Sequence, residues 1–407
     1  MINLDFNQCQ STFMHVDLNS CFARIEQQAN PLLRGRPIAV AAYDSPRGCI
    51  LAPSVEAKAL GIKTGFRIFE AKKLCPNLIV LTSDPDKYRF VHHKLHKLLS
   101  YYTADYTAKS IDEFSLNFQN FPGLKIGLHL IGREIKSKIK SEIGDWLTVS
   151  VGIGPNRFLA KTASNLHKPD GLDEINSKNY LEIYQKLELT DLTGIARANA
   201  THLHHSGIFS VMDFYNAPIH ILHHAFNSIN GYYWYLRLRG LEIDNVDFAR
   251  KSFGHMYSLP KPLSTPEELS PILHKLVVKA GLRLRSHGYT ASGVHISLLY
   301  RDRQFWHHGA IYPEPVSDDY HLYRRAYKIM SSSPYHSPVA NLAVTFFNLS
   351  QNNSLQLDLF GDIKKHINLN LAIDKVTQKY GSFVLTPAKM LGLGEAVHDA
   401  IGFGNIS

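Results

Sequence analysis

The sequence predicts an α+β protein of several domains. The chain has 407 residues, more than one ordinary hydrophobic core accommodates, so we expect two to four domains. Short apolar strands alternate with helical stretches between residues 13 and 166. A ferredoxin-like succession of strand, helix, two strands, helix and strand follows residue 252.

The first predicted elements place an acidic residue at the end of a strand. Residues 13–17 form a short apolar run that predicts a strand, and residues 19–28 predict the helix after it. Asp17 therefore stands where the first strand ends. The residues before this strand have no basic stretch followed by an apolar core, so we expect neither a signal peptide nor an anchor. Met14 is an alternative start of translation.

Residues 31–77 predict a small, separate α/β lobe. It contains a buried strand over residues 38–41 and a helix over residues 55–60 that ends at Gly61. The chain then returns to the first layer. There we expect helices over residues 88–102, 128–143 and 158–166, and strands over residues 110–118 and 147–153.

Two glycine turns separate short helices between residues 190 and 215. They lie in the runs LTGI at 192–195 and GIFS at 207–210. This pattern is typical of a helix-hairpin-helix, whose backbone amides bind a DNA phosphate. A plain helical pair is an equally good interpretation, because Ala196 stands where a second glycine is usual.

The last large domain is predicted to follow a polar linker at residues 244–251. Its first helix should begin after Thr265, a suitable cap, with Pro266 in the first helical position. The other expected elements are strands over residues 252–259, 294–301, 306–311 and 340–349 and a helix over residues 319–330.

The net charge indicates the class of binding partner, and the cysteine content indicates the cellular compartment. The net charge of +9 favours a polyanionic partner, since each phosphate that Lys or Arg neutralises releases a counterion. The four cysteines show no paired metal-binding spacing, so we expect reduced thiols in the cytoplasm. The histidines are scattered and predict no zinc site, and nothing resembles a membrane span.

Three carboxylates are the candidate catalytic groups. Asp17 ends the first strand, and Asp112 and Glu113 are adjacent in the run SIDEF at 110–114. Carboxylates gathered in this way hold the two hard cations that nucleotidyl transfer requires. Adjacent residues of a strand point to opposite faces, so Asp112 and Glu113 share one site only at a turn or bulge. The alternative is a pair of solvated acids at a hairpin end.

Three motifs resemble those of the Y family of DNA polymerases, which copy past damaged bases. They are VDLNSCFA at 16–23, SIDE at 110–113, and SVGIG at 150–154 followed by LAK at 159–161, in the order of the family. The resemblance runs from about residue 13 to residue 349 and implies a right-hand polymerase fold. It implies palm at 13–30 and 84–172, fingers at 31–83, a helical thumb at 173–243, a little finger at 252–350 and a tail at 351–407.

The resemblance also implies roles for the residues of these motifs. Asp17 and Asp112 would bridge two Mg²⁺ ions, for which Mn²⁺ is the expected substitute, Glu113 would bind the catalytic ion, and Leu18 would supply its carbonyl. The incoming dNTP would bind the residues Asn19, Ser20, Cys21, Phe22, Lys58 and Lys161, the first four through amides that open a helix. Phe22 matches the steric gate, a ring under the sugar that rejects a 2′-hydroxyl, although its spacing also suits a core aromatic.

Departures from the family pattern point to one branch. The family segment NYEAR is SVEAK at 54–58, so Val55 replaces a tyrosine and Lys58 an arginine, and lysine cannot make the bidentate fork of a guanidinium. Together with KSFG at 251–254 and the chain length, this resembles the UmuC branch, the polymerase V catalytic subunit. That branch implies an accessory subunit.

Two further sets of residues are expected to bind macromolecules. The resemblance implies that Arg283, Arg285, Arg301, Arg303 and the hairpin residue Gly194 contact the phosphates of a primer-template, without reading bases. A solvated charged face is the alternative. Gln356, Leu357, Leu359 and Phe360 belong to QLDLF at 356–360, which resembles the peptide with which bacterial polymerases bind the sliding clamp, with a core strand as the alternative.

The sequence thus predicts a template-directed, error-prone DNA polymerase that performs translesion synthesis. The alternative within the family is a catalytically silent homologue that acts as a DNA- and clamp-binding scaffold. A helix-hairpin-helix module with unrelated chemistry would leave the three ordered motifs unexplained.

Overall fold

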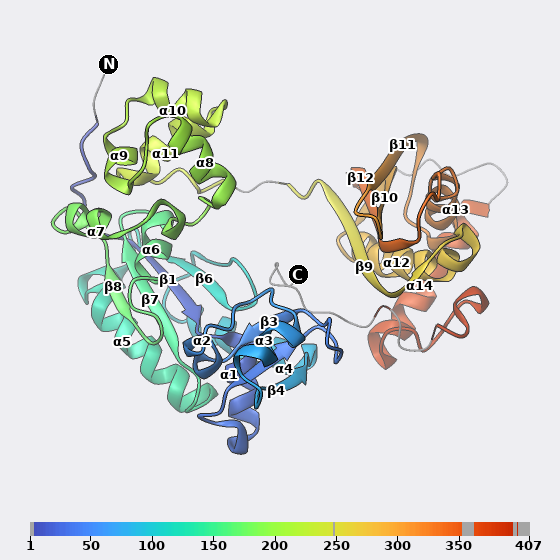
Figure 1. Cartoon of the computed structure of the whole chain (residues 1–407), viewed down its shortest axis with the longest axis horizontal. Helices are drawn as coiled ribbons and strands as arrows, with labels where there is room; N and C mark the ends of the chain where they lie inside the picture. The colour runs from blue at the N-terminus through green and yellow to red at the C-terminus, as the bar shows by residue number, and fades with distance from the viewer. Residues whose placement is uncertain (1–3, 247–248, 352–361, 394–396, 398–407) are drawn as a thin grey trace. The chain divides into compact units, whose positions relative to one another are not determined.

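The computed structural model describes residues 4–246, 249–351, 362–393 and 397 (Figure 1). These residues fall into two compact units, one before residue 247 and one after residue 248. Among the described residues, no helix is long and apolar enough to cross a membrane.

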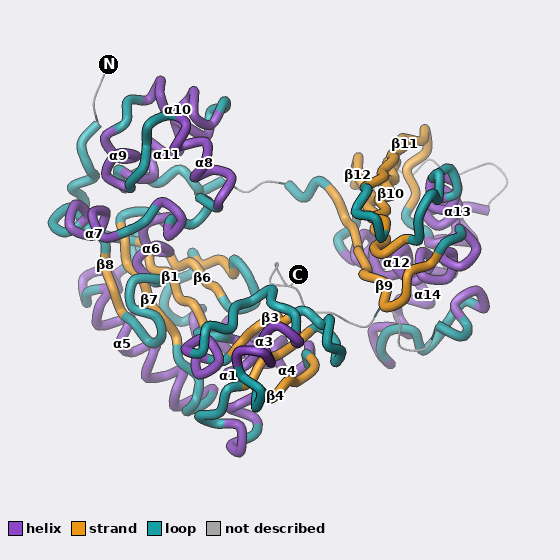
Figure 2. The backbone as a smooth tube through the Cα atoms, in the orientation of Figure 1, coloured by secondary structure: helices purple, strands orange, loops and turns teal. Residues whose placement is uncertain are grey.

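The first unit is built on a five-stranded sheet in the order β5-β6-β1-β7-β8 (Figure 2). Its strands are β1 (Phe13–Leu18), β5 (Tyr106–Ala108), β6 (Glu113–Asn117), β7 (Val149–Gly154) and β8 (Leu172–Glu174). The central strand β1 lies antiparallel to β6 and β7, and its six residues are all buried. In this register Asp17 lies opposite Glu113 of β6 on one side and Ser150 of β7 on the other. The acid near the end of the first predicted strand therefore lies on the central strand of the sheet.

Helices cover this sheet and share its core with the strands. They are α1 (Cys21–Ala29), α4 (Pro85–Leu99), α5 (Leu128–Lys138) with the π-helical turn η3 (Ile139–Ile143), and α6 (Arg157–Ala163). The sequence predicted each of them to within a few residues. Helix α6 lies unusually close to β7, because a Cβ atom on Gly152 would be only 2.0 Å from the carbonyl oxygen of Ala160.

The lobe between β1 and α4 has its own sheet and its own core. The sheet has the order β3-β2-β4, with β2 (Ile38–Ala41), β3 (Ile50–Pro53) and β4 (Ile79–Thr82), and the helices are α2 (Val55–Ala59) and α3 (Ile68–Leu74). The predicted strand and the first helix are confirmed. The other three elements were missed, since each is too short to show periodicity.

A helical subdomain completes the first unit. Its helices are α7 (Tyr180–Lys186), α8 (Arg197–His205), α9 (Val211–Asn216), α10 (Ile219–Phe226) and α11 (Asn230–Leu238), and the 3-10 turn η4 (Leu189–Asp191) lies between α7 and α8. They enclose an aromatic core around Phe214 and Trp234, to which Phe158 of α6 contributes.

The second unit is an antiparallel four-stranded sheet with helices on it. The strands, in the order β11-β10-β12-β9, are β9 (Ser252–Leu263), β10 (Tyr289–Tyr300), β11 (Phe305–Val316) and β12 (Val339–Gln351). The helices are α12 (Pro266–Ser286), α13 (Asp319–Met330) and α14 (Asp362–Tyr380), followed by the turn η6 (Ala388–Met390). The predicted succession of elements is confirmed, and Thr265 caps α12 in a capping box with Glu268. Helix α14 was not predicted.

Candidate active site

A tight turn brings Asp112 and Glu113 to one site. Asp112 lies in the turn between β5 and β6, and Glu113 is the first residue of β6. The hydroxyl of Ser110 shapes this turn, because it accepts hydrogen bonds from both amides and donates to Asp112 Oδ1 at 2.5 Å. The Leu18 amide also donates to the Asp112 carbonyl at 2.9 Å. The predicted departure from a regular strand is therefore present, and it places the turn beside the end of β1.

The three predicted carboxylates converge at the end of β1. Carboxylate oxygens of Asp17 and Glu113 and a ring nitrogen of His15 all lie within 4.8 Å of one another. Burial, followed by the neighbouring Asp17 and Glu113, raises the pKa of Asp112 to about 6. Burial likewise raises the pKa of Asp17. Such an accumulation of buried acids requires cations as partners.

Lysines surround these acids in the described structure. Lys168 Nζ donates to Asp17 Oδ2 at 2.6 Å, and Lys161 donates to Glu113. Lys58 faces the same acids: partial burial and then Lys168 lower its pKa, and Asp17 and Asp112 oppose that shift. Lys58 and Lys161 therefore both lie beside the carboxylates, and their binding of a triphosphate stays a prediction. Lys168 was missed, because it stands in a loop outside the three motifs.

His15 was also missed, although strand alternation gives its position. It lies two residues before Asp17 and therefore on the same face of β1. Its Nε2 is 3.7 Å from Glu113 Oε2, and this buried nitrogen has no hydrogen-bond partner among the described residues. Burial, with Lys161 and Lys168 next, lowers the pKa of His15 well below its usual value, so the ring is neutral. A neutral imidazole beside carboxylates fits a divalent cation, as does the oxygen-rich donor set.

The start of α1 differs in part from the predicted nucleotide-binding loop. The Asn19 amide donates to the Thr148 carbonyl at 2.9 Å, a contact that the predicted binding of a triphosphate by this amide would have to replace. The Asn19 side chain is also committed, since it donates to Ser150 Oγ and accepts from the Asp170 amide. Asn19 therefore joins β1 to its neighbours. Ser20 is left-handed at φ 48°, and its buried hydroxyl has no partner among the described residues.

Phe22 lies in the core of the first unit. Its side chain has no exposed surface, and its ring stacks on that of Tyr88, with 4.3 Å between the ring centres. Cys21 beside it is buried as well. This placement agrees with the core-aromatic interpretation, and the gate role of Phe22 stays a prediction.

Gly194 occupies a position that only glycine fills well. Its φ is +99°, and an added Cβ would lie 3.2 Å from the ring of Trp234. A cavity of about 350 Å³ joins Gly194 and Trp234 to His15 and Lys161, with Arg157 among its lining residues. The predicted DNA-contacting turn therefore shares a cavity with His15 and Lys161, two neighbours of the acids, although Asp17, Asp112 and Glu113 do not line it.

One of the four predicted DNA-binding arginines is structural. The side chain of Arg285 is 7% exposed, and its guanidinium binds Asp319 and Asp374, each at 2.7 Å. The prediction that Arg285 contacts DNA is wrong, because the group is used to fasten α14 to α12 and α13. Arg301 and Arg303 are exposed, and so is Arg283, which donates to the Gly254 carbonyl.

The predicted clamp-binding residues Gln356, Leu357, Leu359 and Phe360 lie outside the described residues.

Comparison with known proteins gives a consistent family. The model of the impB/mucB/samB family matches residues 16–165, and that of the family's C-terminal domain matches residues 250–359. DNA polymerase IV of Pelotomaculum thermopropionicum is 31% identical over 94% of this chain and 98% of its own length. DNA polymerase IV 1 of Bacillus subtilis is 30% identical, over 90% of each chain.

Solved structures show the same fold. A chimera of the Y-family DNA polymerases Dbh and Dpo4 superposes with a TM-score of 0.74 at 23% identity, covering 84% of this chain and 99% of the chimera. An insertion ternary complex of Dbh DNA polymerase superposes with a TM-score of 0.57 at 22% identity, over the same shares of each chain.

The relatives correct the predicted branch. They carry the name DNA polymerase IV and align over nearly their whole length, so the similarity points to that branch and away from UmuC. The expected accessory subunit depended on the UmuC branch and loses its basis with it. The family itself is settled by the matched models and the near-complete alignments. The chain belongs to the Y family of DNA polymerases.

Proposed function

We propose that this chain is a template-directed DNA polymerase that transfers nucleotides from dNTPs to a primer 3′-hydroxyl and copies past damaged bases. The observation that carries the proposal is that Asp17, at the end of β1, lies beside Glu113 and the adjacent turn residue Asp112, about 95 residues later in the chain. Relatives named DNA polymerase IV support the same activity. A silent scaffold would have no need for this cluster of acids, whose mutual repulsion costs stability unless cations offset it.

We propose Asp17, Asp112 and Glu113 as the groups that hold divalent cations, with Mg²⁺ as the physiological ion. Oxygen ligands suit this hard cation, and the Leu18 carbonyl completes the proposed set. Bound there, a pair of such ions would activate the 3′-hydroxyl and neutralise charge on the phosphates. His15 contributes a neutral ring beneath the acids and keeps water from that side of Glu113.

Lysine side chains supply the proposed triphosphate site. Lys58 and Lys161 already lie beside the carboxylates, and Lys168 joins them as a third ammonium group. Phosphates that bind there would offer these lysines new partners when the carboxylates bind cations. The amides of Ser20 and Cys21, at the start of α1, are the remaining proposed donors.

The proposed partners are a primer-template, dNTPs and the bacterial sliding clamp. Gly194 and the exposed Arg283, Arg301 and Arg303 are the proposed phosphate contacts, and QLDLF at 356–360 is the proposed clamp peptide. None of these contacts requires a particular base sequence, as befits a polymerase.

Primer extension tests the proposal. The purified chain should extend a labelled primer when Mg²⁺ and all four dNTPs are present, and should insert a nucleotide opposite an abasic site. Binding of the primer-template without extension, by a folded protein at saturating Mg²⁺, would instead support the scaffold.

A further inference from the structure

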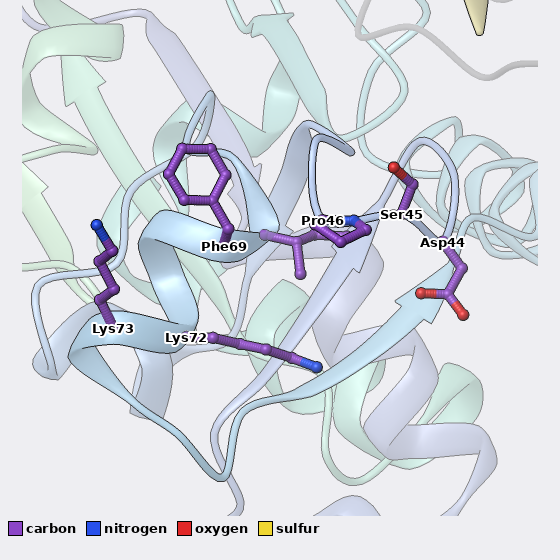
Figure 3. Close-up of a pocket in the computed structure, with 7 residues that line it drawn as sticks. Asp44, Ser45, Pro46, Phe69, Lys72 and Lys73 are labelled. Atoms are coloured by element: carbon purple, nitrogen blue, oxygen red, sulfur yellow. The ribbon is translucent and has the colours of Figure 1, made fainter.

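A preformed pocket lies on the surface of the lobe that carries β2, β3 and β4. Loop residues 44–46 and helix α3 line an open hollow of about 420 Å³, and Figure 3 shows the side chains that line it. Backbone hydrogen bonds close the loop on the helix, from the Phe69 amide to the Pro46 carbonyl at 2.9 Å and from the Ile68 amide to the Gly48 carbonyl at 3.0 Å. A Cβ on Gly48 would be 2.3 Å from the Tyr43 carbonyl oxygen, so the loop in this conformation has no room for a larger residue there.

The pocket combines one aromatic face with two positive charges. Phe69 is 43% exposed, and Lys73 Nζ is 5.7 Å from the centre of its ring. Lys72 and Lys73 are both exposed and form no ion pair with a described residue. As Figure 3 shows, all three side chains come from α3, and Asp44, Ser45 and Pro46 come from the loop beside it.

The surrounding lobe is the most basic part of the chain. Residues 31–83 contain eight Lys and Arg but only three Asp and Glu, a net charge of +5 out of the total of +9. This excess favours a polyanion, and an exposed ring favours a polyanion that has flat bases. Asp44 on the rim repels a phosphate at that edge and can accept a hydrogen bond from the exocyclic amine of a base.

We infer that this pocket binds an unpaired nucleotide of single-stranded DNA, with the base against Phe69 and the flanking phosphates at Lys72 and Lys73. The inference rests on the proposed function, because the uncopied template ahead of the primer end is the single strand that a polymerase must hold. The contact is indifferent to sequence, since every base has a face that stacks. It would hold the template at a site other than the one that contains the carboxylates.

Binding measurements on two DNA substrates test the inference. The full-length protein is titrated, by fluorescence anisotropy, with a primer-template that has a single unpaired template nucleotide and with one that has a long unpaired template. The wild type should bind the long substrate roughly tenfold more tightly, and Phe69→Ala should remove this preference. The double variant Lys72→Ala/Lys73→Ala should also remove this preference. For the long substrate, it should reduce the slope of log affinity against log salt concentration by about 1.4, because two phosphate contacts are lost.

Matched controls come from α4, which carries a similar arrangement outside the pocket. Phe90 is 62% exposed, and Lys94 Nζ is 5.5 Å from its ring centre. Phe90→Ala and the double variant Lys94→Ala/Lys97→Ala should both leave the preference intact. All variants should bind the short substrate as the wild type does.

The outcomes separate the inference from the proposed function. A protein that binds neither substrate contradicts the proposed function. Equal binding of both substrates by the wild type, or an unchanged preference in Phe69→Ala, overturns the inference alone. Loss of the preference in the lysine variant but not in Phe69→Ala also overturns it, because general charge attraction would then suffice.

Discussion

The ammonium group of Lys168 lies 2.6 Å from a carboxylate oxygen of Asp17. The pair joins the central strand of the first sheet to a loop that follows α6, and burial raises the pKa of Asp17 against the effect of the lysine. Lys168 thus neutralises an acid that we propose as a ligand of a divalent cation, and the cation and the lysine act as alternative partners of Asp17.

Lys168→Met should make the stability of the chain depend more strongly on Mg²⁺. Without divalent cations, the variant leaves Asp17 unpaired and should unfold roughly 2–4 °C below the wild type. At saturating Mg²⁺ the difference should shrink, because the ion stabilises the folded form that binds it. Differential scanning fluorimetry measures both values. Lys178→Met, at an exposed lysine, is the control, and a Mg²⁺-independent deficit in Lys168→Met would contradict the expected exchange of partners.

Asp112→Asn should abolish primer extension while preserving the fold. We expect a loss of roughly a thousandfold or more, since an amide cannot replace the charge that holds a cation. Burial and two neighbouring acids disfavour the ionised form of Asp112, so its neutral replacement should keep or raise the melting temperature. Single-turnover extension and primer-template binding are the measurements.

The control for that change is Asp86→Asn, at a highly exposed acid of α4. It should extend primers at the wild-type rate. Normal turnover in Asp112→Asn would end the proposed role of this residue.

Phe22→Leu should increase the incorporation of ribonucleotides if this ring is the sugar gate. The change removes a fully buried aromatic and should cost about 1–3 kcal/mol of unfolding free energy, so stability and selection must be measured together. Phe118, the residue after β6, has an equally buried ring, and Phe118→Leu provides the control. Similar destabilisation of both variants, with no change in sugar selection in Phe22→Leu, would leave Phe22 as a core residue only.

Replacing Leu359 and Phe360 by Ala should abolish stimulation by the sliding clamp and leave clamp-free extension unchanged. The two apolar side chains are the proposed anchors in a pocket of the clamp. Extension with and without clamp gives the stimulation factor. A double change at the exposed Leu369 and Leu371 of α14 is the control, and equal stimulation in the motif variant would assign clamp binding elsewhere.

The second unit should lose stability in acid through His274. Its ring stacks on Tyr323, and burial, followed by Lys389, lowers the pKa of His274 to about 4. The unfolded chain takes up this proton near pH 6.5, so stability is lost as the pH falls from about 6.5 to about 4. His274→Phe keeps a ring without titration, and should reduce the loss of unfolding free energy between about pH 7 and pH 5 by about 2 kcal/mol. Calorimetry measures the unfolding free energy at each pH. The same loss in His274→Phe as in the wild type would contradict the role of His274 in acid sensitivity.

Local patterns predicted the elements that position the acids, and distant contacts account for what was missed. The apolar run at residues 13–17 predicted β1, and strand alternation predicted a turn or bulge at Asp112 if this residue and Glu113 share one site. Alternation also placed His15 beside Asp17, but a single histidine on a buried strand gives no reason to choose it. Lys168 stands in a loop 151 residues from its partner, and no local pattern links the two.

Arg285 shows why charged helical positions are hard to interpret from sequence. It was interpreted as part of a solvated or DNA-binding face, and its actual partners, Asp319 and Asp374, follow 34 and 89 residues later. The second of them belongs to α14, whose existence was not predicted. Because α14 was not predicted, nothing in the sequence indicated that Arg285 has Asp374 as a partner.

The absent side chain of Gly152 sets the distance between β7 and α6, and α6 carries Lys161 to Glu113. Any larger residue at position 152 would push that helix outward and withdraw the ammonium group, even though position 152 bears no functional group of its own. Genetic screens for altered polymerase behaviour should therefore recover changes at this glycine. Sequence comparisons limited to polar residues would overlook a position that tunes the spacing of the whole site.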